Sequence, residues 1–237
     1  MDNLGNTAAA GMFARMQTLD VVANNLANAA TSGYKAQFEF QELLEGVNGR
    51  EVPQARSQWT DLAQGTLVPT GKSTDLALSG AGFFVVEGKS GPLLTRNGSF
   101  RQLPSGELAS TEGYRVRSSA GGSLSLRPGV PFLVRPDGVV MQDGVEAGRI
   151  AVAEVADFNG LEKMGNSLFD PKNAGELKAS DAEVVQGSVE GSNVSVVDAS
   201  VRMISVMRQF ESLQKALTLN AEMNRKTLEE VARVSAG

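Results

Sequence analysis

Residues 196–217 read V-V-D-A-S-V-R-M-I-S-V-M-R-Q-F-E-S-L-Q-K-A-L, and their apolar members recur every three or four positions. This spacing is typical of a helix that packs on another helix. Ser195 followed by Asp198 resembles a capping box, and the helical pattern continues to about Val234. Such a helix is roughly 60 Å long, too long to fold back inside a small globule. The stripe consists of Val196, Ala199, Met203, Val206, Phe210, Leu213 and Leu217.

The N-terminus carries a second stripe with the same spacing, made mostly of alanine and methionine. It predicts a helix over residues 1–33, with Gly33 at the position where glycine ends many helices. Asparagines near that end are poor helix formers, so we do not expect this helix to be stable alone. Periodicity leaves open whether the two stripes meet within one chain or between chains. The second stripe contains Gly5, Ala9, Met12, Met16, Leu19, Ala23, Leu26 and Ala30.

The middle of the chain reads as short strands separated by turns. Phe83-Phe84-Val85-Val86 is typical of a buried strand, and Asn97-Gly98 predicts a hairpin turn between residues 93–96 and 99–102. A polar, period-free stretch lies between the first helix and these strands. The predicted domains are therefore an N-terminal helix at 1–33, an extended connector at 34–75, a β-rich domain at 76–190 and a C-terminal helix at 191–237.

Composition excludes several classes of function. Hydrophobic residues make up 41% and aromatic residues 5%, and the net charge of −5 does not favour nucleic acid or an anionic membrane. The chain has no cysteine and no histidine, which excludes disulfides, imidazole zinc sites and His-dependent triads. No apolar run approaches the ~20 residues that span a bilayer. The N-terminus lacks the features of a cleaved secretory signal, so any export is expected to leave it intact.

Catalytic and ligand-binding motifs have simpler explanations. Gly65 to Ser73 resembles a phosphate loop, but five residues separate its glycines and Pro69 cannot donate a backbone N–H. Gly80-Ala81-Gly82 lacks the third glycine of a dinucleotide fingerprint. A glycosidase carboxylate pair stays open, because such pairs meet only in space. We expect no catalytic, cofactor-binding or metal-binding residues and no cofactor. A secreted adhesin with a helical stalk and a carboxylate-based wall hydrolase are the alternative classes.

Several blocks of the sequence resemble the flagellar rod and hook protein family. Residues 23–35, A-N-N-L-A-N-A-A-T-S-G-Y-K, are similar to the family's N-terminal signature A-N-N-[LI]-A-N-x-x-T-x-G-[YF]-[KR]. Residues 74–86 and 94–100 resemble its middle-domain motifs. Residues 187–197 resemble its L-E-x-S-N-V block, with Val189 in place of leucine. The blocks occur in order across both ends and the middle.

This resemblance implies a fold and a function. The implied fold is α+β, with the long terminal helices paired as a coiled-coil-like inner domain and an all-β middle domain outside it. The implied function is a structural subunit that assembles with copies of itself and other rod proteins, proximal and distal, and transmits torque from motor to hook. The resemblance also implies passage through the flagellar type III export apparatus to the basal body. No nucleic acid, membrane insertion or small-molecule substrate is expected.

Length narrows the resemblance to the proximal-rod and distal-rod branches of the family, and Met207-Arg208-Gln209-Phe210-Glu211 looks more like the proximal-rod branch. Candidate assembly residues come from the two stripes and from the terminal motifs. They are Met12, Met16, Leu19, Ala23, Asn24, Asn25, Leu26, Asn28, Thr31, Gly33, Tyr34, Ser192, Asn193, Val194, Val197, Met203, Val206, Phe210, Leu213 and Leu217.

Overall fold

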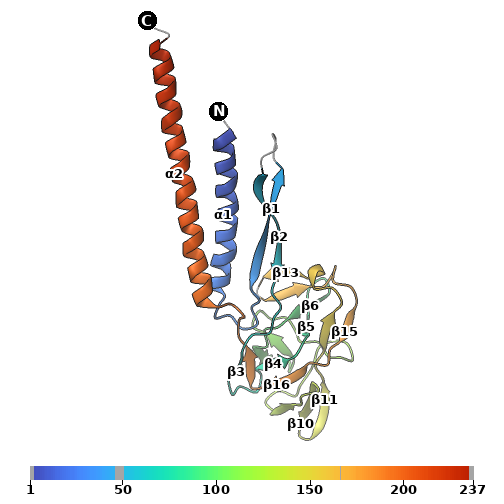
Figure 1. Ribbon diagram of the computed structural model, residues 1–237. Coiled ribbons are helices and arrows are strands. Elements are labelled where there is room, and N and C mark those ends of the chain that lie inside the picture. Colours follow the sequence, from blue (N-terminus) through green and yellow to red (C-terminus); the bar gives the residue numbers. More distant parts are fainter. Residues whose placement is uncertain (1–2, 46–50, 166, 235–237) are drawn as a thin grey trace. The chain divides into compact units, whose positions relative to one another are not determined.

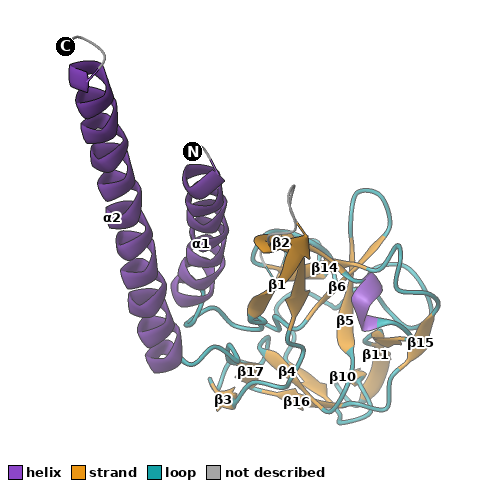
Figure 2. Cartoon of the chain, turned by 45° about the horizontal axis from the view of Figure 1, so that its top comes forward, coloured by secondary structure: helices purple, strands orange, loops and turns teal. Residues whose placement is uncertain are grey.

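A computed structural model describes residues 3–45, 51–165 and 167–234. The chain divides into two compact units (Figures 1 and 2). We call residues 1–27, 37–61 and 194–237 the helix–hairpin unit, and residues 28–36 and 62–193 the β unit. The fold is α+β, because the two helices lie at the chain ends and the middle is rich in strands.

The helix–hairpin unit contains α1 (Asn3–Ala27), β1 (Gln37–Glu45), β2 (Glu51–Thr60) and α2 (Val196–Val234). The β unit contains β3 (Leu67–Pro69), β4 (Leu76–Ser79), β5 (Phe83–Glu87), β6 (Pro92–Thr95), β7 (Phe100–Gln102), β8 (Leu108–Ser110), β9 (Phe132–Val134), β10 (Val139–Gln142), β11 (Val145–Arg149) and β12 (Val152–Val155). It continues with the short helix η1 (Phe158–Gly160), β13 (Glu162–Gly165), β14 (Leu168–Asp170), β15 (Leu177–Ala179), β16 (Glu183–Gln186) and β17 (Ser188–Glu190).

In the helix–hairpin unit, α1 and α2 run antiparallel side by side (Figure 1). Gly11 of α1 lies against Leu213 of α2, so the start of α1 lies near residue 221 of the longer helix. At the start of α2, the Ser195 hydroxyl accepts a hydrogen bond from the Asp198 amide at 3.3 Å. The hydroxyl therefore satisfies one of the amides that the first turn of any helix leaves unpaired.

The segment predicted to be an extended connector forms the antiparallel hairpin β1–β2. Phe38 and Trp59 are opposite each other across the hairpin, and their rings stack with centroids 4.8 Å apart. The hairpin packs on α1, where the Thr18 hydroxyl donates to a Glu39 carboxylate oxygen at 2.8 Å. The side-chain NH₂ group of Asn25 donates to the Gln37 carbonyl at 2.6 Å, and the Asn25 Oδ1 accepts a hydrogen bond from the Gln37 backbone amide at 2.9 Å.

The two helices lie side by side, but the prediction that their two stripes pair as a coiled coil is wrong. The buried residues of α1 lie on a different stripe from the predicted one, and Met16 of the predicted stripe is 51% exposed. An alanine-rich helix offers more than one stripe with three-four spacing, so periodicity could not select between them. The hairpin decides which stripe of α1 is buried, because it supplies hydrogen-bond partners for Thr18 and Asn25. The buried residues of α1 are Ala14, Thr18, Val21, Val22 and Asn25.

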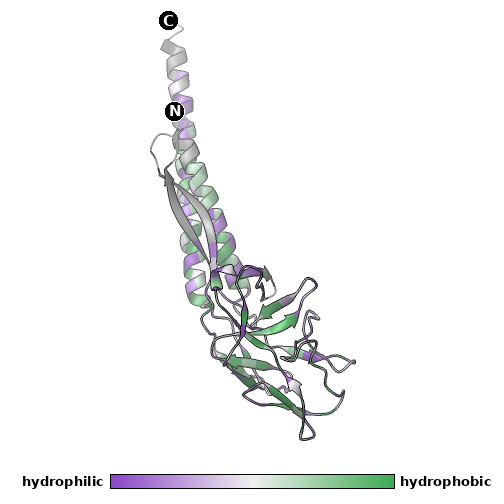
Figure 3. Cartoon of the chain, turned by 90° about the vertical axis from the view of Figure 1, so that its right-hand side faces the viewer, coloured by the Kyte–Doolittle hydropathy of each residue, from purple (hydrophilic) through white to green (hydrophobic). Residues whose placement is uncertain are grey.

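The β unit is built on a six-stranded antiparallel sheet with the order β13-β14-β6-β5-β12-β15. Strand β5 lies inside this sheet and is covered on both faces: Phe84 and Val86 belong to one apolar cluster, Phe83 and Val85 to another. Alternate residues of a strand point to opposite faces, which explains its uninterrupted apolar sequence. Figure 3 shows apolar residues concentrated on the strands of this unit.

The predicted hairpin around Asn97-Gly98 is also wrong, because β6 and β7 belong to different sheets. The turn nevertheless forms: the Asn97 side chain accepts a hydrogen bond from the Ser99 amide at 3.0 Å. A Cβ at Gly98 would collide with the Leu76 carbonyl. The dipeptide therefore permits a close backbone approach that carries the chain from one sheet to the next.

Candidate assembly surface

One face of α2 is turned toward α1. Val206 is 5% exposed, and Met203, Phe210, Leu213 and Leu217 are half-buried. These are members of the C-terminal stripe, and their three-four spacing keeps them on one side of the helix. The inner face of α2 thus has a partner within the same chain along the length that α1 covers.

The opposite face of α2 leaves apolar side chains in contact with solvent. Val197 is 72% exposed, Val201 62% and Ile204 53%. We call Val197, Val201, Ile204 and the neighbouring Arg208 the outer face of α2. Val201, Ile204 and Arg208 also line a shallow depression with Ser205, Gln209 and Ser212. Burying such apolar surface stabilises by about 25 cal/mol per Å², so the outer face favours contact with another molecule.

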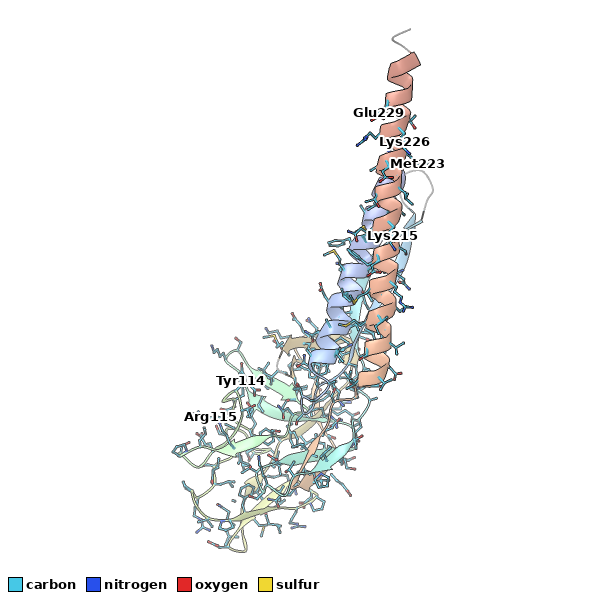
Figure 4. All side chains as sticks on the ribbon, turned by 90° about the vertical axis from the view of Figure 1, so that its left-hand side faces the viewer. Tyr114, Arg115, Lys215, Met223, Lys226 and Glu229 are labelled. Atoms are coloured by element: carbon cyan, nitrogen blue, oxygen red, sulfur yellow. The ribbon has the colours of Figure 1, made fainter. Side chains whose placement is uncertain are left out.

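The exposed apolar residues continue along the unit. Leu219 and Met223 are 60% and 67% exposed on the part of α2 near and beyond the start of α1. Figure 4 shows Met223 on this part of α2, with Lys215 nearer the start of the helix and Lys226 and Glu229 nearer its end. Phe13 on α1 is 62% exposed. The surface available for assembly therefore alternates apolar and charged groups.

The predicted N-terminal residues differ in exposure. Asn25 is buried against the hairpin, whereas its neighbour Asn24 is exposed. Met16 is exposed, and the remaining predicted residues of α1 are neither fully buried nor fully exposed. They are Met12, Leu19, Ala23 and Leu26, all half-buried.

The terminal motif residues lie mostly in the β unit. The Thr31 amide donates to the Asn28 carbonyl at 3.0 Å, and Gly33 and Tyr34 are buried. Ser192 and Asn193 are half-buried, and the Asn193 side chain accepts a hydrogen bond from the Ala36 amide at 2.8 Å. Val194, also half-buried, begins the part of the chain that leads to α2. The predicted set of assembly residues is therefore divided between two units.

Sequence reasoning missed three buried charges beside these motifs. Lys35 and Glu190 are fully buried, and Arg96 is 4% exposed. The Lys35 ammonium and the Glu190 carboxylate are 2.5 Å apart. Lys35 is the last residue of the N-terminal motif and Glu190 lies in the C-terminal motif, so the motifs already contained two of these charged residues. Nothing local indicated that the two would meet.

Two ionisable groups beside this cluster titrate away from their ordinary values. Burial lowers the pKa of Lys163 to about 8 and raises the pKa of Tyr34. The Lys163 ammonium lies 3.8 Å from the centroid of the Tyr34 ring. The Lys163 ammonium also donates to the Lys35 carbonyl at 3.0 Å, so this carbonyl and the face of the Tyr34 ring together hold Lys163 in place.

The described residues do not assemble a recognisable catalytic or metal site. A cavity of about 450 Å³ in the β unit is lined by Tyr114, Met164, Asp170 and Lys172 among others, without a nucleophile paired to a base. Within the described ranges no three acidic side chains gather closely enough to hold a metal ion. Neither helix, over its described length, is long and apolar enough to cross a bilayer.

Comparison with known protein families places the chain among flagellar axial proteins. Residues 6–35 match the flagella basal body rod protein family, and residues 77–156 match the D1 domain of flagellar hook proteins FlgE/F/G. Residues 185–230 match the C-terminal region of flagellar basal body rod FlgEFG proteins. The three matches follow the order of the chain.

Individual relatives place the chain more narrowly, among the rod proteins of the flagellar axial proteins. The chain is 31% identical to the flagellar basal-body rod protein FlgF of Caulobacter vibrioides, over 99% of this chain and all of the relative. It is 33% identical to FlgF of Mesorhizobium japonicum, over 86% of this chain and 88% of that protein. FlgG of Agrobacterium fabrum is 30% identical over 91% and 94% of the two chains. The chain therefore belongs to the flagellar basal-body rod protein family and is a structural subunit of the rod in the basal body.

Proposed function

We propose that this subunit occupies the proximal rod, where it assembles with copies of itself and with other axial proteins. The similarity to FlgF proteins carries the proposal, since it extends over the whole chain at 31% identity. Residues 207–211 support it independently. A distal-rod position is the second candidate, favoured by FlgG relatives that cover about as much of the chain at 29% and 30% identity.

The assembly surface in this proposal is the outer face of α2 together with the exposed apolar residues of α1. Helices of neighbouring subunits pack there and remove Val201, Ile204 and Phe13 from water. Torque then passes from motor to hook through many such contacts. No step of this function makes or breaks a covalent bond, so the subunit acts by assembly and not as an enzyme.

The export route follows from the same proposal. The subunit leaves the cell body through the flagellar type III export apparatus and keeps its N-terminus. Membership of the rod family supports this route, since a rod subunit must travel from the ribosome to the basal body. Mass spectrometry of assembled rods should therefore recover the unprocessed N-terminal peptide.

Purified basal bodies provide the test of position. We expect peptides of this chain in the rod fraction, and zero-length cross-links from α2 to other axial proteins. Rods isolated from a strain that lacks the distal-rod protein should still contain this chain. A chain absent from those shortened rods but present in complete ones would favour the distal position. Absence from basal bodies altogether would overturn the assignment.

A further inference from the structure

Three charged side chains are buried together in the β unit, and assembly through α2 uses none of them. Lys35, Glu190 and Arg96 are shielded from solvent, although such residues are rarely buried unless they are paired. We propose that these residues form a clasp that joins the two terminal motifs and the middle of the chain. The β unit closes only when all three segments are in place.

Glu190 is the centre of the clasp. Its Oε1 accepts hydrogen bonds from Lys35 Nζ at 2.5 Å and from the Gly65 amide at 2.8 Å. Its Oε2 accepts one from Arg96 Nη1 at 3.2 Å. Two cations and a backbone amide thus share one carboxylate in a site without water contact, where each pairing is strong and each loss is costly.

Each of the two cations also donates one hydrogen bond to the backbone, in a different part of the chain. Lys35 Nζ donates to the Ala63 carbonyl at 2.6 Å, and Arg96 Nη2 donates to the Gly80 carbonyl at 2.8 Å. The Arg96 guanidinium also lies 5.4 Å from the centroid of the Phe83 ring. The clasp therefore reaches from the terminal motifs to the six-stranded sheet through its central strand.

Backbone contacts beside the charges hold the same segments. The Gly33 amide donates to the Glu190 carbonyl at 2.7 Å, and the Gly191 amide donates to the Thr66 carbonyl at 2.8 Å. The Asn193 side chain bridges the Ala36 amide and the Ala63 carbonyl. Residues 33–36, 63–66 and 190–193 thus form one hydrogen-bonded layer.

Sequence separation makes this clasp a late event in folding. Lys35 and Glu190 are 155 residues apart. Contacts this distant form only after the entropy of closing a long loop has been overcome. The segment just before α2 is therefore required for the β unit to close, even though most of that unit lies far upstream. Removing the Glu190 carboxylate would remove the counter-charge that both cations share.

A double-mutant cycle on the full chain tests the coupling. We compare Lys35→Met, Glu190→Gln and the double variant, with Glu183→Gln on the exposed side of β16 as the control. In a Trp59→Phe background, near-ultraviolet circular dichroism follows the β unit, because both tyrosines, Tyr34 and Tyr114, lie in it. We expect each single variant to lower the thermal midpoint by roughly 10 °C and the double variant by clearly less than the sum.

Amide hydrogen exchange gives a second, local measurement. Glu190→Gln should accelerate exchange at Gly65 by about tenfold or more, while Val140 in β10 changes much less. If Glu190→Gln does not fold, Glu190→Asp keeps the charge and permits the same measurement. Strictly additive midpoint losses, or a Glu190→Gln variant that behaves like Glu183→Gln, would overturn the clasp. Either result concerns the purified monomer and leaves the rod assignment unaffected.

Discussion

Gly33 occupies a backbone conformation that other residues adopt only with strain. Its φ is +68°, and a Cβ would collide with the backbone of Asn97. The N-terminal motif predicts that the first helix ends at this glycine, but α1 ends at Ala27. The glycine instead lets the chain pass against the turn after β6 and present its amide to Glu190.

Gly33→Ala should therefore destabilise the β unit by about 3 kcal/mol or more, since about 1–2 kcal/mol of left-handed strain adds to the collision. Gly122→Ala is the matched control, because its φ is +73° but no atom lies within 4 Å of the place that its Cβ would take. It should cost about 1 kcal/mol. Urea unfolding of both variants in the Trp59→Phe background, followed by the near-ultraviolet circular dichroism of the tyrosines, measures the two losses. Equal losses would show that the close approach at Gly33 contributes nothing.

Lys163 predicts a pH dependence at the same site. Its folded pKa of about 8 lies below the ordinary value of 10.5, so the unfolded chain binds more protons between these two values. Stability should therefore rise with pH from about 8 toward 10 relative to Lys163→Met. Above pH 10 the raised pKa of Tyr34 acts in the opposite direction. Urea midpoints of the two proteins across this range measure the difference, and a parallel pH dependence would contradict the prediction.

At the scale of elements, α1 is positioned by polar contacts as well as by apolar ones. Val21 and Val22 are buried, but Thr18 and Asn25 on the same face are hydrogen-bonded to the hairpin. The hairpin itself offers little core of its own, as expected for two isolated strands. The helix α1 and the hairpin therefore depend on each other. Asn25 connects them through two hydrogen bonds to the backbone of Gln37.

Asn25→Ala should weaken the attachment of the hairpin by about 2–3 kcal/mol, because the Gln37 amide and carbonyl would both lose their partner. Trp59 is the only tryptophan in the chain and lies in β2, so its fluorescence reports on the hairpin. Asp20→Ala, on the exposed side of α1, is the control. If both variants shift the urea midpoint of the fluorescence equally, the asparagine contacts do not hold the hairpin.

At the scale of the whole molecule, the two faces of α2 have different tasks. The inner face is covered by α1 of the same chain, and the outer face is not covered within the described part of the helix–hairpin unit. Helices with apolar residues on opposite sides are poorly suited to an isolated surface position. This arrangement agrees with the family's structural role, in which the subunit functions only as part of an assembly.

Ile204→Asp should leave the fold intact, within about 0.5 kcal/mol, because the side chain is 53% exposed. It should nevertheless abolish swimming, since a carboxylate would be buried between neighbouring helices. Ile204→Leu, which keeps the apolar surface, should swim normally. Soft-agar motility, together with detection of exported subunit, measures the effect. A swimming Ile204→Asp strain would exclude the outer face from the assembly.

Local patterns explain what could be predicted. The alternation of three and four in residues 196–217 and the run Phe83–Val86 depend on neighbours in sequence, so both elements were located correctly. The hairpin β1–β2 was missed because alternation in β1 is confined to residues 37–41 and β2 is mostly polar and contains Pro53. The turn at Asn97-Gly98 was recognised, but its connection was not, because a turn motif does not specify which strands will pair.

The sequence by itself determined the helical ends, the strand-rich middle and, through three ordered motifs, the family. Tertiary structure alone decided which stripe of α1 is buried and which face of α2 stays exposed. It also decided that Lys35 meets Glu190. The physical reason is that secondary structure follows periods of a few residues, whereas the pairing of a buried charge depends on the closure of a loop of 155 residues, which no local pattern encodes.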